Sequence, residues 1–234
     1  MQCNKWLTAV FFSIITLCSS AQRIGHIRID TSECSRRSLN LSDPRVVKAM
    51  QGAEIYIKSI LGTDVVKNRV WHNCFTSKET QRPIFSKDHG KPARLGQDTC
   101  YELYYYVKDK NETIGSFALF VNRFGQLVTY EYGEHDFNQP QLIRGFKKHF
   151  ANSFRFSYAD ALKMGKAKGF TYGPELKCYT ENKFISNATG EEFVKVKYTW
   201  SFFSITNGGD EAELEINAET GKIEKEQYIP RMPK

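Results

Sequence analysis

The densest cluster of side chains that could do chemistry lies in YEYGEHDFN, residues 130–138. It contains Glu131, Glu134, His135 and Asp136. Carboxylates and imidazoles bind metal ions and carry protons, so this segment could form a metal or acid–base site. Neighbouring residues point in different directions, however, and a solvated loop after a strand explains the same composition. We expect the solvated loop, without a metal or other cofactor, and keep a secreted enzyme that uses these four residues as the alternative.

A second candidate for chemistry is VWHNC, residues 70–74, where His72 and Cys74 would face the same side of a strand. A thiolate–imidazole pair is conceivable there, but outside the cytoplasm a disulfide at Cys74 is favoured. The sequence contains no Gly-x-Ser-x-Gly, HExxH, Walker or dinucleotide-binding motif. We therefore expect no catalytic residues and no enzyme.

Aromatic residues offer a candidate binding surface. Four tyrosines crowd the strand candidate 100–107, and Trp200 lies in the aromatic strand candidate 193–203; the tyrosines are Tyr101, Tyr104, Tyr105 and Tyr106. Consecutive residues of a strand occupy both faces, so some of these rings should reach the outer face and bind a peptide, glycan or protein. The alternative is ordinary sheet packing with the hydroxyl groups at the rim.

The N-terminus has the pattern of a secretory signal peptide. Residues 1–21 combine Lys5, an apolar run and the small residues Ser19 and Ala21, which predicts cleavage after Ala21. The apolar run is shorter than the roughly 20 residues that a membrane span needs. We expect a secreted or periplasmic protein without a membrane span. Loss of Lys5 lowers the formal charge from +7 to +6, and its even spread favours a solvated surface over a nucleic-acid partner.

Export changes the interpretation of the cysteines. Four remain after cleavage, which predicts two disulfides with three possible connectivities: Cys34, Cys74, Cys100 and Cys178. Of these we prefer Cys74–Cys100 together with Cys34–Cys178. Three sequons would carry glycans only in a eukaryotic secretory pathway, at Asn40, Asn111 and Asn187.

The elements that must position these residues occur in two similar series. Helices are expected at 42–62 and 157–169, each with a polar N-terminal cap and a glycine at its end. NCFTSKE (73–79) then parallels KCYTENK (177–183), and an aromatic strand follows in both series. Finally LFVNRFGQL (119–127) parallels LEINAETGKI (214–223), where Gly125 and Gly221 are expected to supply the positive φ of a hairpin turn.

The same order of elements in both series favours duplication of one unit. The alternative is that unrelated α+β domains contain similar helices, strands and turns. The expected organisation is a signal peptide (1–21), an N-terminal tail (22–41), a first unit (42–133), a connecting helix (134–156) and a second unit (157–234). The connecting helix should bury apolar residues and place Arg144, Lys147 and Lys148 outside. The polar segment 80–99 has no counterpart in the second series and is expected to be a long loop.

Residues 200–227, WSFFSITNGGDEAELEINAETGKIEKEQ, resemble the PepSY and PepSY-like domains. Such units occur in the propeptides of secreted metallopeptidases and in bacterial cell-envelope proteins, and their fold is similar to that of cystatins. The resemblance is good over 157–229 and poor over 42–133, where NRFGQL departs from the acidic turn. It implies an α+β fold of two cystatin-like units, each a helix packed on a curved antiparallel sheet.

Two departures limit what the resemblance implies about function. The sequence shows no peptidase domain, and QLVTY (126–130) places Tyr130 where inhibitory cystatins have glycine. No inhibitory site is therefore carried over. We expect an exported, non-catalytic binding or regulatory protein that engages a peptide or protein, for example a secreted peptidase. The alternatives are the secreted enzyme named above and an envelope or matrix structural protein.

Overall fold

The computed structural model describes residues 23–30, 39–86, 93–128, 134–185, 192–205 and 210–230. These residues form helices and two β-sheets, which confirms the α+β class. The helices are α1 (Pro44–Leu61), α2 (Thr63–Arg69), α3 (Glu134–Phe150) and α4 (Tyr158–Ala167). The strands are β1 (Arg23–Ile24), β2 (Ile27–Asp30), β3 (Val70–Ser86), β4 (Ala93–Asp109), β5 (Glu112–Asn122), β6 (Glu175–Ile185), β7 (Glu192–Ile205), β8 (Glu211–Asn217) and β9 (Ile223–Ile229). None of the helices in this described part of the chain has the length and apolar character needed to cross a membrane.

The first sheet contains β1 to β5 in chain order. Strands β2 and β3 run parallel, and all other neighbours are antiparallel. The segment 22–41, expected to be a tail, therefore contributes two strands to this sheet. Ile27 and Ile29 alternate with polar residues in β2, and their side chains are buried in the core.

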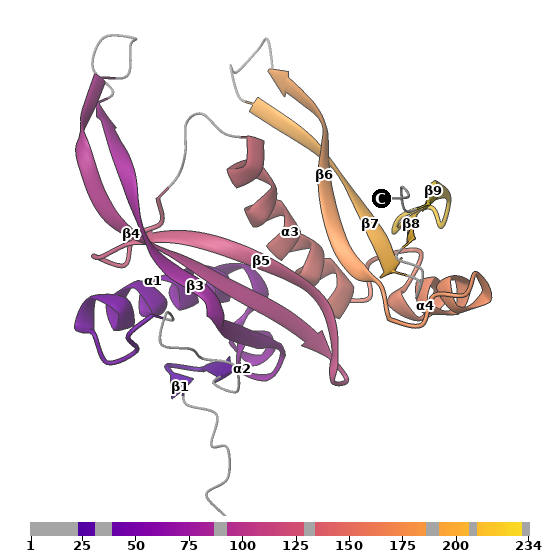
Figure 1. Ribbon diagram of the computed structural model, residues 1–234, viewed down its shortest axis with the longest axis horizontal. Coiled ribbons are helices and arrows are strands. Elements are labelled where there is room, and N and C mark those ends of the chain that lie inside the picture. The colour runs from indigo at the N-terminus through magenta and orange to yellow at the C-terminus, as the bar shows by residue number, and fades with distance from the viewer. Residues whose placement is uncertain are drawn as a thin grey trace, which may run out of the picture.

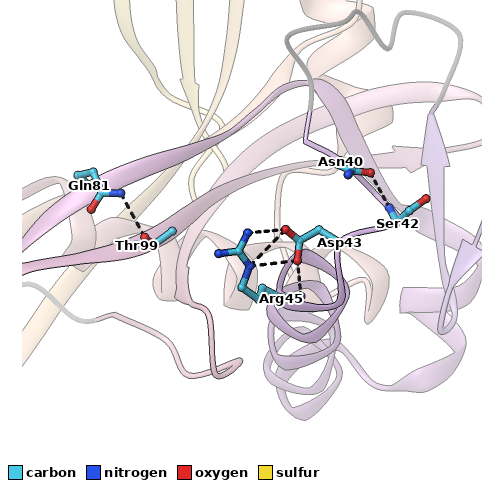
Figure 2. Close-up of polar contacts among 6 residues, drawn as sticks. All are labelled: Asn40, Ser42, Asp43, Arg45, Gln81 and Thr99. Carbon is cyan, nitrogen blue, oxygen red and sulfur yellow. Dashed lines mark hydrogen bonds and ion pairs between the residues drawn. The ribbon is translucent and has the colours of Figure 1, made fainter.

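Helix α1 packs on the inner face of the first sheet with Val46, Met50 and Ile57 buried. Asp43 caps it, because a carboxylate oxygen of Asp43 accepts a hydrogen bond from the Arg45 amide at 2.8 Å. The Arg45 guanidinium binds the same carboxylate at 2.7 Å (Figure 2). Pro44 occupies the first turn, where its missing N–H costs nothing. The local sequence is thus sufficient to start this helix.

The second sheet contains β6 to β9, all antiparallel and in chain order. Helix α4 precedes it and begins with a reciprocal capping box between Ser157 and Asp160. The inner face of this sheet buries Trp200 and Phe202 of β7 with Leu214 and Ile216 of β8. Strand β9 is the outer edge of the sheet, and most of its side chains are exposed.

The two meanders turn in the same way after β5 and β8. Asn122 begins the first turn and Asn217 the second, and the side-chain oxygen of each accepts two backbone N–H groups of its own turn. Gly125 has a φ of 81° and Gly221 a φ of 73°, a region that glycine adopts readily. The first turn leads only to an isolated bridge between Val121 and Leu127, whereas the second leads into β9.

The expected loop at 80–99 is instead mostly strand. Strand β3 continues to Ser86 and β4 begins at Ala93, with pairs such as Gln81–Thr99 along the arm. The Gln81 side-chain amide also donates to the Thr99 hydroxyl at 3.2 Å (Figure 2). Because backbone hydrogen bonds hold this two-stranded arm, it needs no apolar pattern. The long β3–β4 and β6–β7 hairpins extend toward the same side of the molecule in Figure 1.

Helix α3 lies between the two sheets (Figure 1). Phe146 is fully buried and packs near Phe117 of β5, while Gly145 lies against the Tyr198 ring of β7. The buried residues of both halves form one continuous hydrophobic core. The helix expected to be a connection is therefore also a central packing element.

Candidate functional site

The structure describes only part of the predicted acidic cluster at 130–138. Glu131 lies outside the described residues, and for Glu134, His135 and Asp136 the structure describes the backbone but not the side chains. These three residues form the first turn of α3 rather than a loop. Among the described residues, no group of three His, Cys, Asp or Glu side chains could hold a metal ion.

The predicted aromatic surface is wrong at three of its five positions. Tyr101, Tyr105 and Trp200 are buried, because their strands lie in the interior of the two sheets and these rings face the core. The Trp200 indole donates to the Phe156 carbonyl at 3.0 Å, which fixes it there.

The two remaining tyrosines lie on the outer face of β4, where both hydroxyl groups bind carboxylates. Tyr104 donates to Glu102 at 2.5 Å, and Tyr106 donates to Asp30 at 2.8 Å. The Lys108 ammonium lies over the Tyr106 ring. Tyr104 and Tyr106 therefore stabilise the outer face of the sheet and do not form an open aromatic patch.

Neither preferred disulfide is present. Cys100 and Cys178 are buried and lie outside any disulfide, whereas Cys74 is disulfide-bonded, and Cys34 lies outside the described residues. Cys100 lies on β4 four residues from Tyr104, the partner of Asn73. Cys74 follows Asn73 and lies one residue nearer to Cys100, which still leaves about 10 Å along the strand, beyond the roughly 7 Å that a disulfide allows between Cα atoms.

Burial at Cys178 raises the pKa of its thiol to about 11, so this thiol is protonated at neutral pH. Among the sequons, Asn40 and Asn111 are exposed, and Asn187 lies outside the described residues.

His72 contacts Ser77 rather than a cysteine thiolate. Its Nε2 lies 2.9 Å from the Ser77 hydroxyl, inside the bulge of β3. Burial lowers the pKa of His72 to about 4, so the ring is neutral at pH 7. With Cys74 in a disulfide, no thiolate–imidazole pair exists here.

The strongest candidate site is a groove of about 820 Å³ beside α3, which we call the basic groove. It lies among α1, α3 and β7. It is lined by Tyr56, Ser59, Ile60, Gln141, Arg144, Lys147, Lys148, Ala151, Ser153, Val196 and Tyr198. Three of these side chains are cationic and none is acidic. Its size is within the range of small-ligand and short-peptide sites.

Two cations of the basic groove have no acidic partner among the residues that the structure describes. The Arg144 guanidinium donates to the side-chain oxygen of Gln141 at 3.3 Å, and no carboxylate among the described residues forms an ion pair with Arg144 or Lys147. Lys148 binds Glu219 at 2.8 Å and lies over the Tyr198 ring, 5.2 Å from its centroid. The groove therefore carries uncompensated positive charge.

Tyrosines form the apolar walls of the groove and fix its shape. The Tyr198 hydroxyl donates to the Gln141 carbonyl at 3.0 Å, which ties β7 to α3. A Cβ at Gly145 would lie 2.5 Å from the Tyr198 ring, so only glycine allows this approach. Burial raises the pKa of Tyr198 to about 12, and burial also raises the pKa of Tyr56 although Arg144 opposes it. Both hydroxyl groups are neutral donors at pH 7.

The sequence analysis placed Arg144, Lys147 and Lys148 on an ordinary solvated helix face. Their spacing of three and four residues puts them on one stripe, and that stripe contains no acid between Gln141 and Phe150. This basic stripe without acidic residues is the sequence signal that could have indicated the groove. The other walls of the groove come from α1 and β7, which are distant from α3 in the sequence, so no local sequence pattern indicates them.

No family model matches the chain, and comparisons with curated proteins and with solved structures find no significant match. The PepSY-like resemblance therefore stays a prediction.

Proposed function

We propose that this is an exported, non-catalytic binding protein that holds an acidic segment of a partner peptide or protein in the basic groove. The observation that carries this proposal is the uncompensated charge of Arg144 and Lys147 beside the rings of Tyr56 and Tyr198. An arginine guanidinium binds a carboxylate through two parallel hydrogen bonds. The tyrosine rings add apolar contact, and the Tyr56 hydroxyl adds a neutral donor.

Within this proposal the two halves of the fold are PepSY-like units of the cystatin-like kind. A helix precedes an antiparallel meander in each half, and each meander reaches an Asn–Gly turn. Relatives of intermediate sequence would test the assignment. A family match of such relatives to a different fold class would contradict it, without affecting the basic groove.

The first experiment measures peptide binding by fluorescence anisotropy. The probe is a labelled decapeptide of alternating glutamate and tyrosine, and the comparison peptide replaces each glutamate by lysine. The acidic peptide should bind, and its affinity should fall between 50 and 300 mM salt because salt screens exposed charges. Equal affinity for the two peptides would sink the proposal.

A charge-reversed variant locates the interaction. The double substitution Arg144→Glu and Lys147→Glu should weaken acidic-peptide binding at least about tenfold, since attraction becomes repulsion. The matched control is Lys163→Glu with Lys166→Glu, which makes the same charge change on exposed positions of α4. Equal losses in the two variants would show that only net charge matters. Pulldown from the native secretome with both variants then identifies the partner and tests whether it is a peptidase.

A further inference from the structure

The three cations of the basic groove are not equivalent. The Lys148 ammonium binds the Glu219 carboxylate at 2.8 Å, and each of these side chains is nearly half exposed. Arg144 and Lys147 form no ion pair with any residue that the structure describes. The groove therefore offers two open cations on one face of α3, followed by a lysine that already holds a carboxylate of its own chain.

Glu219 is held beside the groove by the turn between β8 and β9. Its backbone N–H donates to the side-chain oxygen of Asn217 at 2.9 Å. The preceding residue, Ala218, is fully buried, and its N–H donates to the Tyr198 carbonyl at 2.9 Å. Tyr198 is a wall of the groove, so the turn that carries Glu219 is bonded directly to that wall. The fold therefore places this carboxylate next to Lys148 before any ligand binds.

The charge of Glu219 also acts inside the groove. Its partner Lys148 lies over the rings of Tyr198 and Phe154, at 5.2 and 5.8 Å from their centroids. Burial raises the pKa of Tyr198 to about 12, and the Glu219 charge raises it as well, whereas Arg144 lowers it. The Glu219 carboxylate thus contributes to the electrostatic potential of the groove, although it is not among the side chains that line it.

The spacing of the cations fits the spacing of acidic residues in an extended peptide. Arg144 and Lys148 are four residues apart in α3, which is about 6 Å along the helix axis. Two side chains on one face of an extended peptide are about 7 Å apart. A peptide carboxylate that binds Arg144 and Lys147 would therefore bring the next acid on the same face to Lys148.

The internal ion pair makes the two acids of such a peptide unequal. The first carboxylate gains cations that have no other partner, and Arg144 can bind it through two parallel hydrogen bonds. The second carboxylate would have to replace Glu219 at Lys148, so one ion pair is exchanged for another. The displaced Glu219 charge would also repel it. A second acid therefore adds little affinity.

We infer that the groove selects a peptide segment with a single carboxylate between apolar or aromatic residues, and that Glu219 determines this specificity. Glu219 supplies from within the chain the acid that a polyacidic segment would bring to Lys148. The carboxylate of the ligand binds Arg144 and Lys147, and its neighbouring side chains contact the apolar walls of the groove. This inference rests on the proposed function, because it concerns the same groove.

Two labelled peptides test the inference by fluorescence anisotropy. One has the core Tyr-Glu-Tyr-Gln-Tyr and the other Tyr-Glu-Tyr-Glu-Tyr, with the same glycine and serine flanks. The second glutamate should change the affinity of the unmodified protein little. In Glu219→Gln, which frees Lys148, the second glutamate should improve affinity at least about threefold more than in the unmodified protein, the size expected for an exposed ion pair.

Two further variants show whether the gain depends on Lys148. Glu226→Gln removes an acid from the exposed ion pair with Lys168 and makes the same change in net charge, so it should not increase the effect of the second glutamate. Adding Lys148→Gln to Glu219→Gln should abolish the gain. Circular dichroism confirms that each variant is folded.

The outcomes separate this inference from the proposed function. If the peptides bind but the second glutamate has the same effect in the unmodified protein and in Glu219→Gln, the inference is wrong and the proposed function stands. The same conclusion follows if Glu226→Gln gives an equal gain, or if the gain persists without Lys148. If neither peptide binds the unmodified protein or any variant, both are wrong.

Discussion

At the scale of single residues, Ser77 determines the state of His72. The Ser77 hydroxyl accepts from the Tyr104 amide at 2.9 Å and lies 2.7 Å from the Asn73 carbonyl, to which it donates. Its one proton is therefore used, so His72 must donate from Nε2. The ring is neutral, and its Nδ1 is buried without a partner among the described residues.

His72 should make the protein less stable as the pH falls. Its pKa is about 4 in the folded protein and about 6.5 when unfolded, so the unfolded chain binds the proton first. Stability is unaffected above about pH 6.5 and falls below it, by about 2 kcal/mol from pH 7 to pH 5. Urea unfolding of His72→Gln at several pH values should show a smaller pH dependence than the unmodified protein. Gln51→Ala, at an exposed position without a titratable group, should keep the original slope.

Residue-level predictions from the sequence succeeded only where the cause was local. The expected polar caps are present, as Asp43 and Ser157, and Gly125 and Gly221 have positive φ, because each feature depends on a few neighbouring residues. The direction of Tyr101 or Trp200 depends on which strands flank its own. That information lies in long-range pairing, so the aromatic surface could not be predicted correctly.

At the scale of elements, the contact between α1 and the turn after β5 requires two glycines. A Cβ at Gly52 would overlap with the carbonyl oxygen of Gly125, and a Cβ at Gly125 would lie 2.8 Å from the Lys48 carbonyl oxygen. Backbone therefore packs against backbone at this point. The turn anchors the end of the first meander on α1.

The substitution Gly52→Ala should destabilise the protein, although replacing glycine by alanine usually stabilises a helix. In an unconstrained helix this change stabilises by about 1 kcal/mol. Here the added methyl group meets backbone, and we expect a loss of about 3 kcal/mol from overpacking. Gln51→Ala, at the exposed neighbouring position, controls for helix propensity and should be neutral or slightly stabilising. A higher midpoint for Gly52→Ala in urea unfolding would contradict the contact.

Element predictions failed where polar sequence forms strands. Cross-strand hydrogen bonds hold the two arms of the β3–β4 hairpin together, so the arms need no apolar pattern. Their polar composition is therefore typical of a loop. Strand β2 joins β3 in parallel across about 40 residues, which no short window of sequence indicates. The basic groove was not predicted for the same reason, because α1 and β7, which complete its walls, are distant from α3 in the sequence.

At the scale of the whole molecule, α3 joins the two halves into one core. Gly115 of β5 approaches both the Phe146 ring and the Leu176 carbonyl of β6, so sheet, helix and sheet meet at one point. The sequence predicted the buried face of this helix. It contained no sign that both sheets pack on that helix, because amphipathic periodicity does not identify a partner.

Phe146→Ala should therefore destabilise both halves together. Truncation of a fully buried phenylalanine costs about 3–5 kcal/mol. Native-state hydrogen exchange should show this loss in the slowest amides of β4 and of β7 alike. Phe203→Ala, at an exposed position, should leave both unchanged. Faster exchange in only one sheet would indicate that the halves unfold separately.

The outer edge strand β9 has a consequence for self-association. Glu224 binds Lys197, Lys225 binds Glu213, and Glu226 binds Lys168, so consecutive residues of this edge carry paired charges. A second molecule that docked here as an added strand would have to strip water from those ion pairs. Fibril-like stacking through β9 is thereby disfavoured, even though its backbone groups face solvent.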